Sequence, residues 1–521
     1  MKTLDIDLTP AQYHRTEELH LAIARKLGIN PSDIGNTRVL RRSLDLRGQI
    51  RYHTLLEVYL NDEPLPAPVY KSPFKDCHNA PPVIIVGAGP SGLFAALRAL
   101  ELGLRPILIE RGKPVEQRKY DIANITRKKS IDSDSNWCFG EGGAGTYSDG
   151  KLFTRSTKRG DIGSVLSKFV EHGASPEITI DAHAHIGTDK LSNIIANIRH
   201  TIESHGGEYH FGCRMTDILI ADGTVLGIVD QHGTHYEGIA VLLATGHSAR
   251  DIYELFHKKG WKLEAKPFAL GVRVEHPQQL IDDIQYKRRR DQYLPPAAYS
   301  LTTQIDGHGV FSFCMCPGGI IVPAATDEGQ QVVNGMSNSK RNSKFANSGI
   351  AVTVSPQDVP EYAHHGALSL LRFQQDVERH IFHAAGNLIN APAQRLTDFC
   401  DNRESRTLNP SNYMGDCTAS PIHRLLPPFV TKCLQEGFCH FDKKMHGFLT
   451  REASVLAVES RTSSPVRIPR GDNFQHPQLK NLYPCGEGAG YAGGIVSSAI
   501  DGINCMNSIY QNSPKTIING I

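Results

Sequence analysis

VIIVGAGPSGLFAALRALELGLRPILIERG, which runs from Val83 to Gly112, is the stretch that decides the fold. It opens with four β-branched residues, which are typical of a buried strand, and passes through a glycine turn into a helix expected to begin near Ser91. A second apolar strand follows and ends at Glu110. Strand, turn, helix and strand in this order predict a complete βαβ unit.

The three glycines of the turn each have a separate expected role. Gly87 permits the tight turn, Gly89 lets the backbone approach a pyrophosphate, and Gly92 lets the helix lie close to the strand. The helix N-terminus then presents its partial positive charge to the phosphates. Glu110, 18 positions after Gly92, is placed to accept hydrogen bonds from ribose hydroxyls. The motif predicts a dinucleotide site; the alternative is a glycine turn in an unrelated α/β fold.

The sequence on the N-terminal side of this unit predicts a separate small domain. Residues 1–62 combine a helical pattern between Tyr13 and Leu27 with strand-like alternation in IRYHTLLEVYL, which indicates an α+β unit. Residues 63–82 are rich in proline and lack periodicity, as an extended linker does. On the C-terminal side we expect a cofactor domain over 80–265, an inserted mixed lobe over 266–444, and a return to the cofactor domain over 445–521.

Composition narrows the range of partners. The chain has 56 Lys and Arg against 54 Asp and Glu, a net charge of +2, so no global field favours nucleic acid or an anionic membrane. The N-terminus lacks the apolar core of a signal peptide and no apolar run is long enough to cross a bilayer, so we expect a cytoplasmic protein. Eleven cysteines without a regular framework fit a reducing compartment. No zinc-type ligand pattern occurs, and we expect no metal.

Three further motifs carry a family resemblance: FGEGGAGTYSDGKL from Phe139, LATGHSARD from Leu243, and PCGEGAGYAGGIVSSAIDG from Pro484. With the βαβ unit they resemble the two-dinucleotide-fold flavoproteins typified by glutathione reductase. More narrowly, the chain resembles a bacterial family of uncharacterised FAD-dependent dehydrogenases, distantly similar to aminoacetone oxidase-like flavoproteins. The resemblance implies an α/β fold: a Rossmann-like FAD-binding domain, an inserted mixed α+β substrate lobe and the small N-terminal α+β domain.

The resemblance also implies a division of the cofactor site between the two ends of the chain. In such proteins the acid that ends the last strand, here Glu487 in place of the usual aspartate, meets the ribityl or diphosphate chain, and the next helix points at the flavin. Gly493 and Gly494 would let that helix approach the ring. The residues expected to bind FAD are Gly87, Gly89, Pro90, Ser91, Gly92, Glu110, Arg111, Arg118, Gly142, Gly143, Ala144, Gly145, Ser148, Asp149, Lys151, Met215, Ala244, Thr245, Gly246, Gly486, Glu487, Gly493, Gly494 and Ile495.

Four residues are candidates for chemistry on a substrate: Lys151, Cys314, Cys316 and Arg461. The C-x-C pair beside a flavin suggests a dithiol-disulfide relay, whereas CPGG is also the sequence of a tight turn, which favours a structural or substrate-lining use. Arg461 lies in a polar cluster that suits either a substrate cavity or ordinary ion pairs.

The function expected from these features is that of an FAD-dependent oxidoreductase. It would pass a hydride or electron pair between flavin N5 and an unidentified small organic molecule. NAD(P)H is a candidate reductant, and it would bind transiently because no second βαβ fingerprint is visible. Two alternatives stay open: a flavin-dependent RNA-modifying enzyme, suggested by the basic RRSLDLRG stretch, and a flavin-bearing redox sensor without catalysis. We expect no membrane partner, and the net charge argues against nucleic acid.

Overall fold

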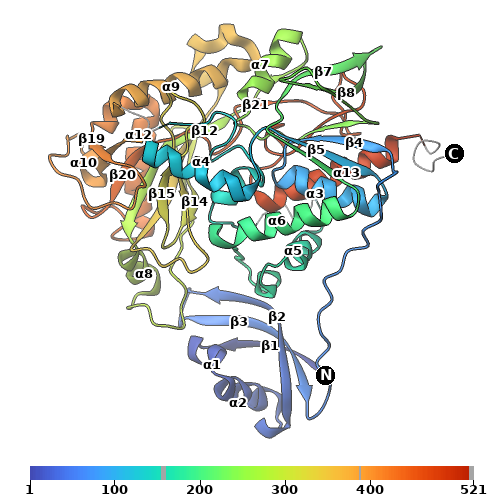
Figure 1. Cartoon of the computed structure of the whole chain (residues 1–521). Helices are drawn as coiled ribbons and strands as arrows, with labels where there is room; N and C mark the ends of the chain where they lie inside the picture. The colour runs from blue at the N-terminus through green and yellow to red at the C-terminus, as the bar shows by residue number, and fades with distance from the viewer. Residues whose placement is uncertain (129, 154–159, 387–388, 515–521) are drawn as a thin grey trace.

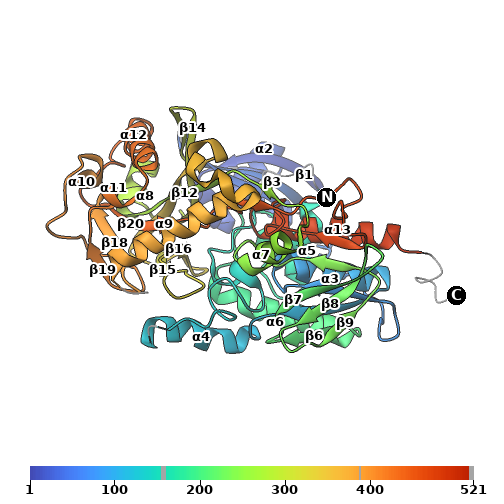
Figure 2. The same ribbon diagram turned by 90° about the horizontal axis from the view of Figure 1, so that it is seen from above.

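The chain folds into three bodies, each built on its own β-sheet. The computed structural model describes residues 1–128, 130–153, 160–386 and 389–514. Figure 1 shows a small N-terminal domain, in blue, below a larger region in which a parallel sheet and a mixed sheet lie next to each other. Figure 2 shows the same two sheets from above, again next to each other.

The first large body is a five-stranded parallel sheet in the order β22-β10-β4-β5-β6. Its strands are β4 (Pro82–Val86), β5 (Arg105–Glu110), β6 (Glu208–Phe211), β10 (Val241–Leu243) and β22 (Leu482–Pro484). The sheet order places β22, from the end of the chain, beside β10 and one strand away from β4. This is the doubly wound arrangement that the βαβ motif predicts, and it confirms the α/β fold class.

Two different layers cover the faces of this sheet. One face packs against α3 (Pro90–Leu102), α5 (Ile162–Glu171), α6 (Thr188–Ser204) and α13 (Ile495–Asn512). The other face packs against α7 (Arg250–Lys259) and a meander of β7 (Met215–Ala221), β8 (Thr224–Asp230) and β9 (His235–Glu237). Each face has its own hydrophobic core, as expected for a parallel sheet buried on both sides.

The second large body is a mostly antiparallel sheet in the order β13-β14-β17-β12-β20-β18-β19. Its strands are β12 (Phe268–Pro277), β13 (Thr302–Ile305), β14 (His308–Cys316), β17 (Phe345–Val354), β18 (Ala391–Arg395), β19 (Cys417–Ala419) and β20 (Ser454–Glu459). Its helices are α8 (Gln278–Tyr286), α9 (Ser369–Ala385), α10 (Leu396–Cys400), α11 (Ile422–Leu425) and α12 (Pro428–Lys444). A short ribbon of β15 (Ile320–Pro323) and β16 (Val333–Met336) accompanies it.

The lobe extends further along the chain than the expected boundary at residue 444. Strand β20 pairs with β12 on one side and β18 on the other, so it lies inside the mixed sheet. The chain returns to the parallel sheet after the two-residue ribbon of β11 (Glu264–Ala265) and β21 (Val466–Arg467), which joins entry and exit. The apolar segment SVLAVE suits a buried strand in either sheet, and pairing partners are not encoded in its local pattern.

The N-terminal domain is a three-stranded antiparallel sheet in the order β1-β3-β2 with two helices. Its elements are β1 (Lys2–Leu8), α1 (Pro10–His14), α2 (Thr16–Leu27), β2 (Ile34–Asp45) and β3 (Arg51–Leu60). The helix expected between Tyr13 and Leu27 is interrupted at Arg15, whose backbone is extended. Residues 61–81 contain no helix or strand and connect the domain to β4. An ion pair from Arg42 to Asp181 ties the domain to the larger region.

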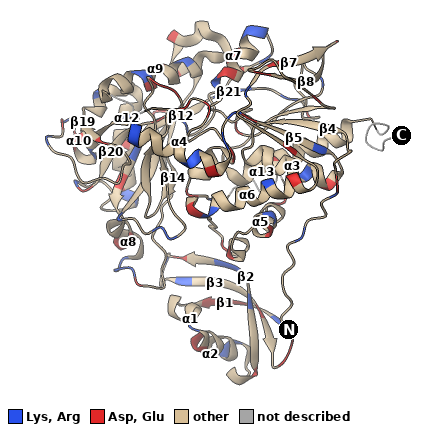
Figure 3. Ribbon diagram, in the orientation of Figure 1, with Lys and Arg blue, Asp and Glu red and all other residues tan. Residues whose placement is uncertain are grey.

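Charged residues are distributed over all three bodies. Figure 3 shows Lys and Arg interspersed with Asp and Glu along the ribbon, in agreement with the small net charge. Within the described ranges, no helix combines the length and apolar character needed to cross a membrane.

Candidate functional site

A cavity of about 370 Å³ lies where the parallel sheet, the lobe and the start of α13 meet. Its wall includes the turn after β4, the end of β10, the segment 138–151 and the first residues of α13. The lobe contributes Phe313, Cys314, Asn334, Arg461 and Thr462. Ligand sites of parallel α/β sheets lie at the carboxyl ends of the strands, and the ends of β4 and β10 meet here.

The turn after β4 is shaped by backbone contacts that exclude side chains. Gly87 has a φ of +106°, and a Cβ there would lie 2.4 Å from the carbonyl oxygen of Ala244. A Cβ on Gly92 would lie 1.9 Å from the carbonyl oxygen of Gly87, so the helix packs directly on the turn. Gly89 differs, because its nearest neighbour would be 3.8 Å away, at Gly143. The turn therefore presents bare backbone at Gly89 to the cavity.

Glu110 holds this turn as well as lining the cavity. Its carboxylate accepts hydrogen bonds from the backbone N–H groups of Ala88 at 2.9 Å, Gly112 at 2.9 Å and Gly140 at 3.0 Å. The side chain is 5% exposed. A carboxylate has about four acceptor positions, so Glu110 joins three backbone segments and keeps capacity for a ligand hydroxyl.

Arg118 does not line the cavity, although the sequence predicts that it binds the cofactor. It lies on α4 (Val115–Lys128) and is fully buried. Its guanidinium donates to the carbonyl oxygens of Asn136 at 2.9 Å, Trp137 at 2.9 Å, Glu141 at 2.9 Å and Gly143 at 2.8 Å. Burial lowers its pKa from the ordinary arginine value. Arg118 therefore shapes the glycine loop that forms the cavity wall, and its contact with any ligand is indirect.

The glycine-rich segment near the C-terminus packs directly onto the first βαβ unit. A Cβ on Gly486 would lie 2.2 Å from the Ser91 hydroxyl, and one on Gly502 would lie 2.1 Å from the Ser91 carbonyl oxygen. By contrast, a Cβ on Gly493 or Gly494 would meet nothing within 4 Å. Gly486 and Gly502 thus let the turn before α13 and α13 itself approach α3, whereas Gly493 and Gly494 leave backbone exposed to the cavity at the helix start.

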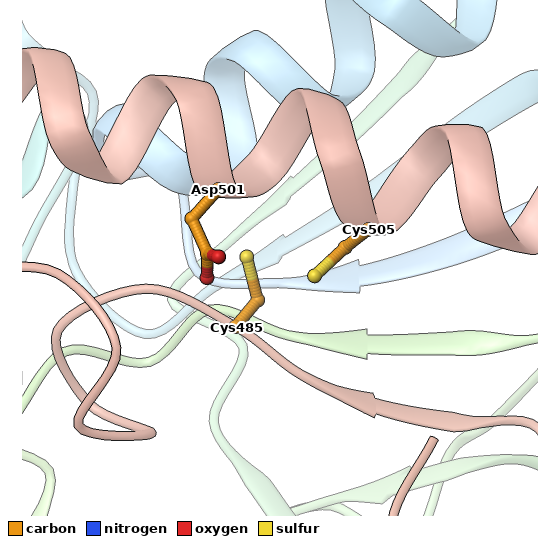
Figure 4. A group of neighbouring side chains, drawn as sticks. All are labelled: Cys485, Asp501 and Cys505. Carbon is orange, nitrogen blue, oxygen red and sulfur yellow. The ribbon is translucent and has the colours of Figure 1, made fainter. Parts of the chain in front are cut away.

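Asp501 on α13 fixes the turn that carries Glu487. Its carboxylate accepts a hydrogen bond from the N–H of Gly486 at 2.7 Å and a bidentate pair from Arg470 at 2.6 and 3.0 Å. Figure 4 shows Asp501 and Cys505 on the same helix, with Cys485 facing them. These three residues lie close enough to share a metal ion. However, the Arg470 guanidinium pairs with Asp501 and also contacts the Cys505 sulfur at 3.3 Å, which disfavours a cation there.

Glu487 and His247 lie next to each other in the cavity wall, with 3.8 Å between Oε1 and Nε2. Burial raises the pKa of Glu487 to about 7, opposed by the nearby Lys266. Burial, together with the charges of Arg461 and Arg250, lowers the pKa of His247 to about 3, so its imidazole is neutral. His247 follows the Ala-Thr-Gly end of β10 directly, and sequence reasoning missed it because that motif stopped one residue earlier.

A buried charge cluster supports Arg461 at the lobe side. Glu378 on α9 is fully buried and pairs with Arg250 at 2.8 Å and with Arg461 at 3.2 Å. These two cations lower the pKa of Glu378 to about 2, although burial alone would raise it. Arg461 also donates to Thr326 at 2.8 Å and Gln330 at 2.7 Å. Its donors are thus used within the protein, which agrees with the ion-pair interpretation of this cluster.

Most residues predicted to contact the cofactor line this cavity. The predicted residues in its wall are Gly87, Gly89, Pro90, Ser91, Glu110, Arg111, Gly143, Ala144, Gly145, Ser148, Asp149, Lys151, Met215, Ala244, Thr245, Gly246, Glu487, Gly493, Gly494 and Ile495. Four others, Gly92, Arg118, Gly142 and Gly486, lie behind it and support its shape. Of the chemical candidates, Lys151, Cys314 and Arg461 line the wall, and Cys316 lies behind Cys314.

Several residues in the wall were not predicted from the sequence. Phe139, Arg214 and Asp251 belong to it in addition to His247. Phe139 stacks beneath the guanidinium of Arg111 at 4.1 Å, and Arg111 also pairs with Asp251 at 3.0 Å. These contacts join segments far apart in the sequence, so no local motif reveals them.

The wall fits a dinucleotide with a flavin end. Bare backbone at Gly89, beside a helix N-terminus, suits a diphosphate. A second helix N-terminus, at Gly493 and Gly494, suits a ring that accepts negative charge. The acidic side chain of Glu110 suits ribose hydroxyls.

Comparison with known proteins supports this interpretation. Residues 267–462 match the family model "FAD-dependent protein, C-terminal domain-like", and residues 1–59 match "Domain of unknown function (DUF8436)". A Clostridium beijerinckii protein described as "Uncharacterized protein" is 37% identical over 516 residues, which cover 95% of this chain and 96% of that protein. The chain belongs to the family of this clostridial protein. The match to this protein extends over all three bodies of the fold, and residues 267–462 form an FAD-dependent protein C-terminal domain.

Two solved structures are similar to this chain at low sequence identity. A geranylgeranyl bacteriochlorophyll reductase-like protein from Thermoplasma acidophilum is 12% identical, with a TM-score of 0.37 over 84% of this chain and 81% of that chain. CtdE, solved in complex with FAD, is 11% identical, with a TM-score of 0.33 over 85% of this chain and 88% of that chain.

Proposed function

We propose that this protein is an oxidoreductase that uses bound FAD to oxidise or reduce a small organic molecule. The observation that carries the proposal is the cavity wall itself. Glycine-rich turns from opposite ends of the chain, at Gly89 and at Gly493 and Gly494, leave backbone open to one cavity. FAD would supply two-electron redox chemistry at its ring.

The residues of the chain would each perform a definite task around the cofactor. The N–H groups at the start of α3 would bind the diphosphate, and Glu110 would orient the adenosine ribose. The N–H groups at the start of α13 would stabilise negative charge on the ring, because the partial positive charge of the helix is concentrated there. The neutral His247 imidazole and Glu487 would exchange or hold a proton at the cavity wall.

The lobe would supply the substrate side of the cavity. Phe313, Asn334 and Thr462 present an aromatic ring, an amide and a hydroxyl to the same space. This combination suits a small molecule held by a few polar contacts within an otherwise apolar surface. NAD(P)H remains our candidate reductant.

A small substrate is favoured here over RNA because three arginines of the N-terminal domain are paired with acids. Arg38 pairs with Glu57 at 3.4 Å, Arg47 pairs with Asp45 at 2.9 Å, and Arg42 pairs with Asp181 of the larger region. A phosphate-binding surface needs cations that are free to meet phosphates. RNA binding that weakens steeply with added salt would contradict this part of the proposal.

The proposal is tested on the purified protein. We expect a visible flavin spectrum, FAD as the nucleotide released on denaturation, and bleaching of the spectrum when NADH or NADPH is added anaerobically. Turnover with an artificial electron acceptor then distinguishes an enzyme from a sensor. A protein that neither retains nor binds added FAD would overturn the assignment.

A further inference from the structure

Two cysteines occupy an irregular end of β14 at the cavity wall. The pairing of β14 with β17 shifts register between Phe313 and Cys316, and Cys314 has a left-handed φ of +46°. Cys314 is half-buried and lines the cavity, whereas Cys316 is fully buried behind it. The Cys316 thiol donates to the carbonyl oxygen of Cys314 at 3.2 Å. One thiol therefore faces the space where a ligand would lie, and the second lies within the same turn.

Two cations are fixed around this turn by other parts of the fold. Lys151 donates to the carbonyl oxygen of Met315, between the two cysteines. Arg273, fully buried on β12, donates to the carbonyl oxygen of Cys314 at 3.3 Å and is held by Glu459 at 2.9 Å and Asn347 at 2.9 Å. Neither cation can move away without breaking these contacts.

The cations and the second thiol favour the thiolate form of Cys314. The neighbouring Cys316 thiol is the largest cause that lowers the Cys314 pKa, and Lys151 and Arg273 lower it further, against the effect of burial. The acids that oppose them are Asp149, Glu459 and Glu487. Asp149 is neutralised by its ion pair with Arg341. The Cys316 pKa is raised, so Cys316 keeps its proton.

We propose that Cys314 and Cys316 form a dithiol that reduces a low-molecular-weight disulfide bound in the cavity. A nucleophilic thiol that faces the ligand space, with a protonated thiol behind it, is the arrangement that thiol-disulfide exchange requires. This inference names a substrate class for the cavity. It rests on the proposed function, because the reductant of that function would restore the two thiols after each turnover. The exchange itself needs no bound cofactor.

The exchange takes place in two balanced steps. The Cys314 thiolate attacks one sulfur of the substrate RSSR, an S–S bond forms to Cys314, and RS⁻ leaves. The Cys316 sulfur then attacks Cys314, the second RS group leaves, and it takes the proton that Cys316 loses. The two cysteines are oxidised by two electrons to a disulfide, and RSSR is reduced to one RS⁻ and one RSH. A bridge between residues two positions apart is strained, and strained disulfides are readily reduced again.

The test uses the reduced, desalted full chain and dithiodipyridine, a small disulfide whose released thiopyridone absorbs light. We expect a fast phase at mildly acidic pH that releases two equivalents and leaves a Cys314–Cys316 disulfide in the peptide map. Cys316→Ser should release one equivalent in that phase and keep a mixed disulfide on Cys314. Cys314→Ser should lose the fast phase. Lys151→Gln should slow it by about tenfold, because each unit of thiol pKa changes the thiolate fraction about tenfold.

Cys439 provides the matched control because it is an exposed cysteine on α12. Cys439→Ser should leave the fast phase unchanged and remove only slower release. The FAD content of the wild type and of each variant is measured separately. Absence of the fast phase in a wild-type protein that still binds FAD would overturn the dithiol and leave the flavin assignment intact. A wild-type fast phase that labels Cys439 first, or two equivalents from Cys316→Ser, would also overturn it.

Discussion

Glu110, the last residue of β5, accepts a hydrogen bond from the backbone N–H of Ala88, in the glycine turn after β4, at 2.9 Å. The same carboxylate accepts two more backbone N–H groups, those of Gly112 and Gly140. Glu110 is expected to meet the ribose. It also joins three backbone segments: the glycine turn at Ala88, the loop after β5 at Gly112 and the glycine loop at Gly140. We therefore expect ligand binding and folding to be coupled at this residue.

Glu110→Ala should lower both stability and FAD affinity. The substitution leaves three buried N–H groups without acceptors, each costing about 1–3 kcal/mol. Glu110→Gln should have an intermediate effect on stability and FAD affinity. Its amide oxygen can still accept hydrogen bonds from Gly112 and Gly140, but its NH₂ group would face the N–H of Ala88, which is also a donor. Chemical denaturation and FAD titration measure the two effects. Glu203→Ala, an exposed position on α6, is the control, and equal stability of the two alanine variants would contradict this account.

Gly493→Ala isolates the contact between backbone and cofactor. Its Cβ would have no protein atom within 4 Å, so the free energy of unfolding without FAD should change by no more than about 0.5 kcal/mol. A methyl group at a helix start that approaches the ring should weaken FAD binding by about tenfold or more, equivalent to about 1.4 kcal/mol. Gly48→Ala, in the N-terminal hairpin, has the same open space and should change neither quantity. Unchanged FAD affinity in Gly493→Ala would place the ring elsewhere.

Arg118→Met tests whether the glycine loop needs its buried cation. Removal of the guanidinium leaves the carbonyl oxygens of Asn136, Trp137, Glu141 and Gly143 without this donor, and we expect a loss of about 3 kcal/mol or more in unfolding free energy. FAD affinity should fall as well, because the loop lines the cavity. Arg127→Ala, on the exposed side of the same helix, is the control for denaturation and FAD titration. Reduced FAD affinity at unchanged stability would instead indicate direct contact with the cofactor.

Sequence motifs predicted those parts of the site that lie within one short stretch of chain. Gly87, Gly89, Gly92 and Glu110 lie within one βαβ unit, whose strand and helix spacings determine where each residue points. Arg118 shows the limit of this reasoning. It was expected at the cofactor, but its partners are carbonyl oxygens of a loop that has no regular pattern, so their position follows from tertiary packing.

The lobe was less predictable for the same reason. Its candidates Cys314 and Arg461 could be named by residue type, but which of them faces the cavity depends on the bulge in β14 and on the Glu378 cluster. The extension of the mixed sheet to β20 depends likewise on strand pairing between distant segments. His247 went unnoticed because the acid that it faces, Glu487, is far away in the sequence.

Glu275→Gln should stabilise the protein at alkaline pH. Glu275 on β12 is 2% exposed, one of its oxygens accepts from the N–H of Asn412 at 3.0 Å, and the other has no partner among the described residues. Burial raises its pKa to about 7. The folded protein therefore binds a proton that the unfolded chain has released, and stability falls as pH rises from about 4 through 7.

Glutamine cannot ionise, so the variant should not lose this stability as the pH rises. We expect Glu275→Gln to be more stable than the wild type by about 1–3 kcal/mol at pH 8, and similar to it near pH 4–5. Urea denaturation at both pH values measures the difference. Glu452→Gln, an exposed carboxylate in the same lobe, should show no such pH-dependent gain. A variant less stable than the wild type at pH 8 would mean that the ionised carboxylate of Glu275 is stabilised by a contact that the amide cannot make.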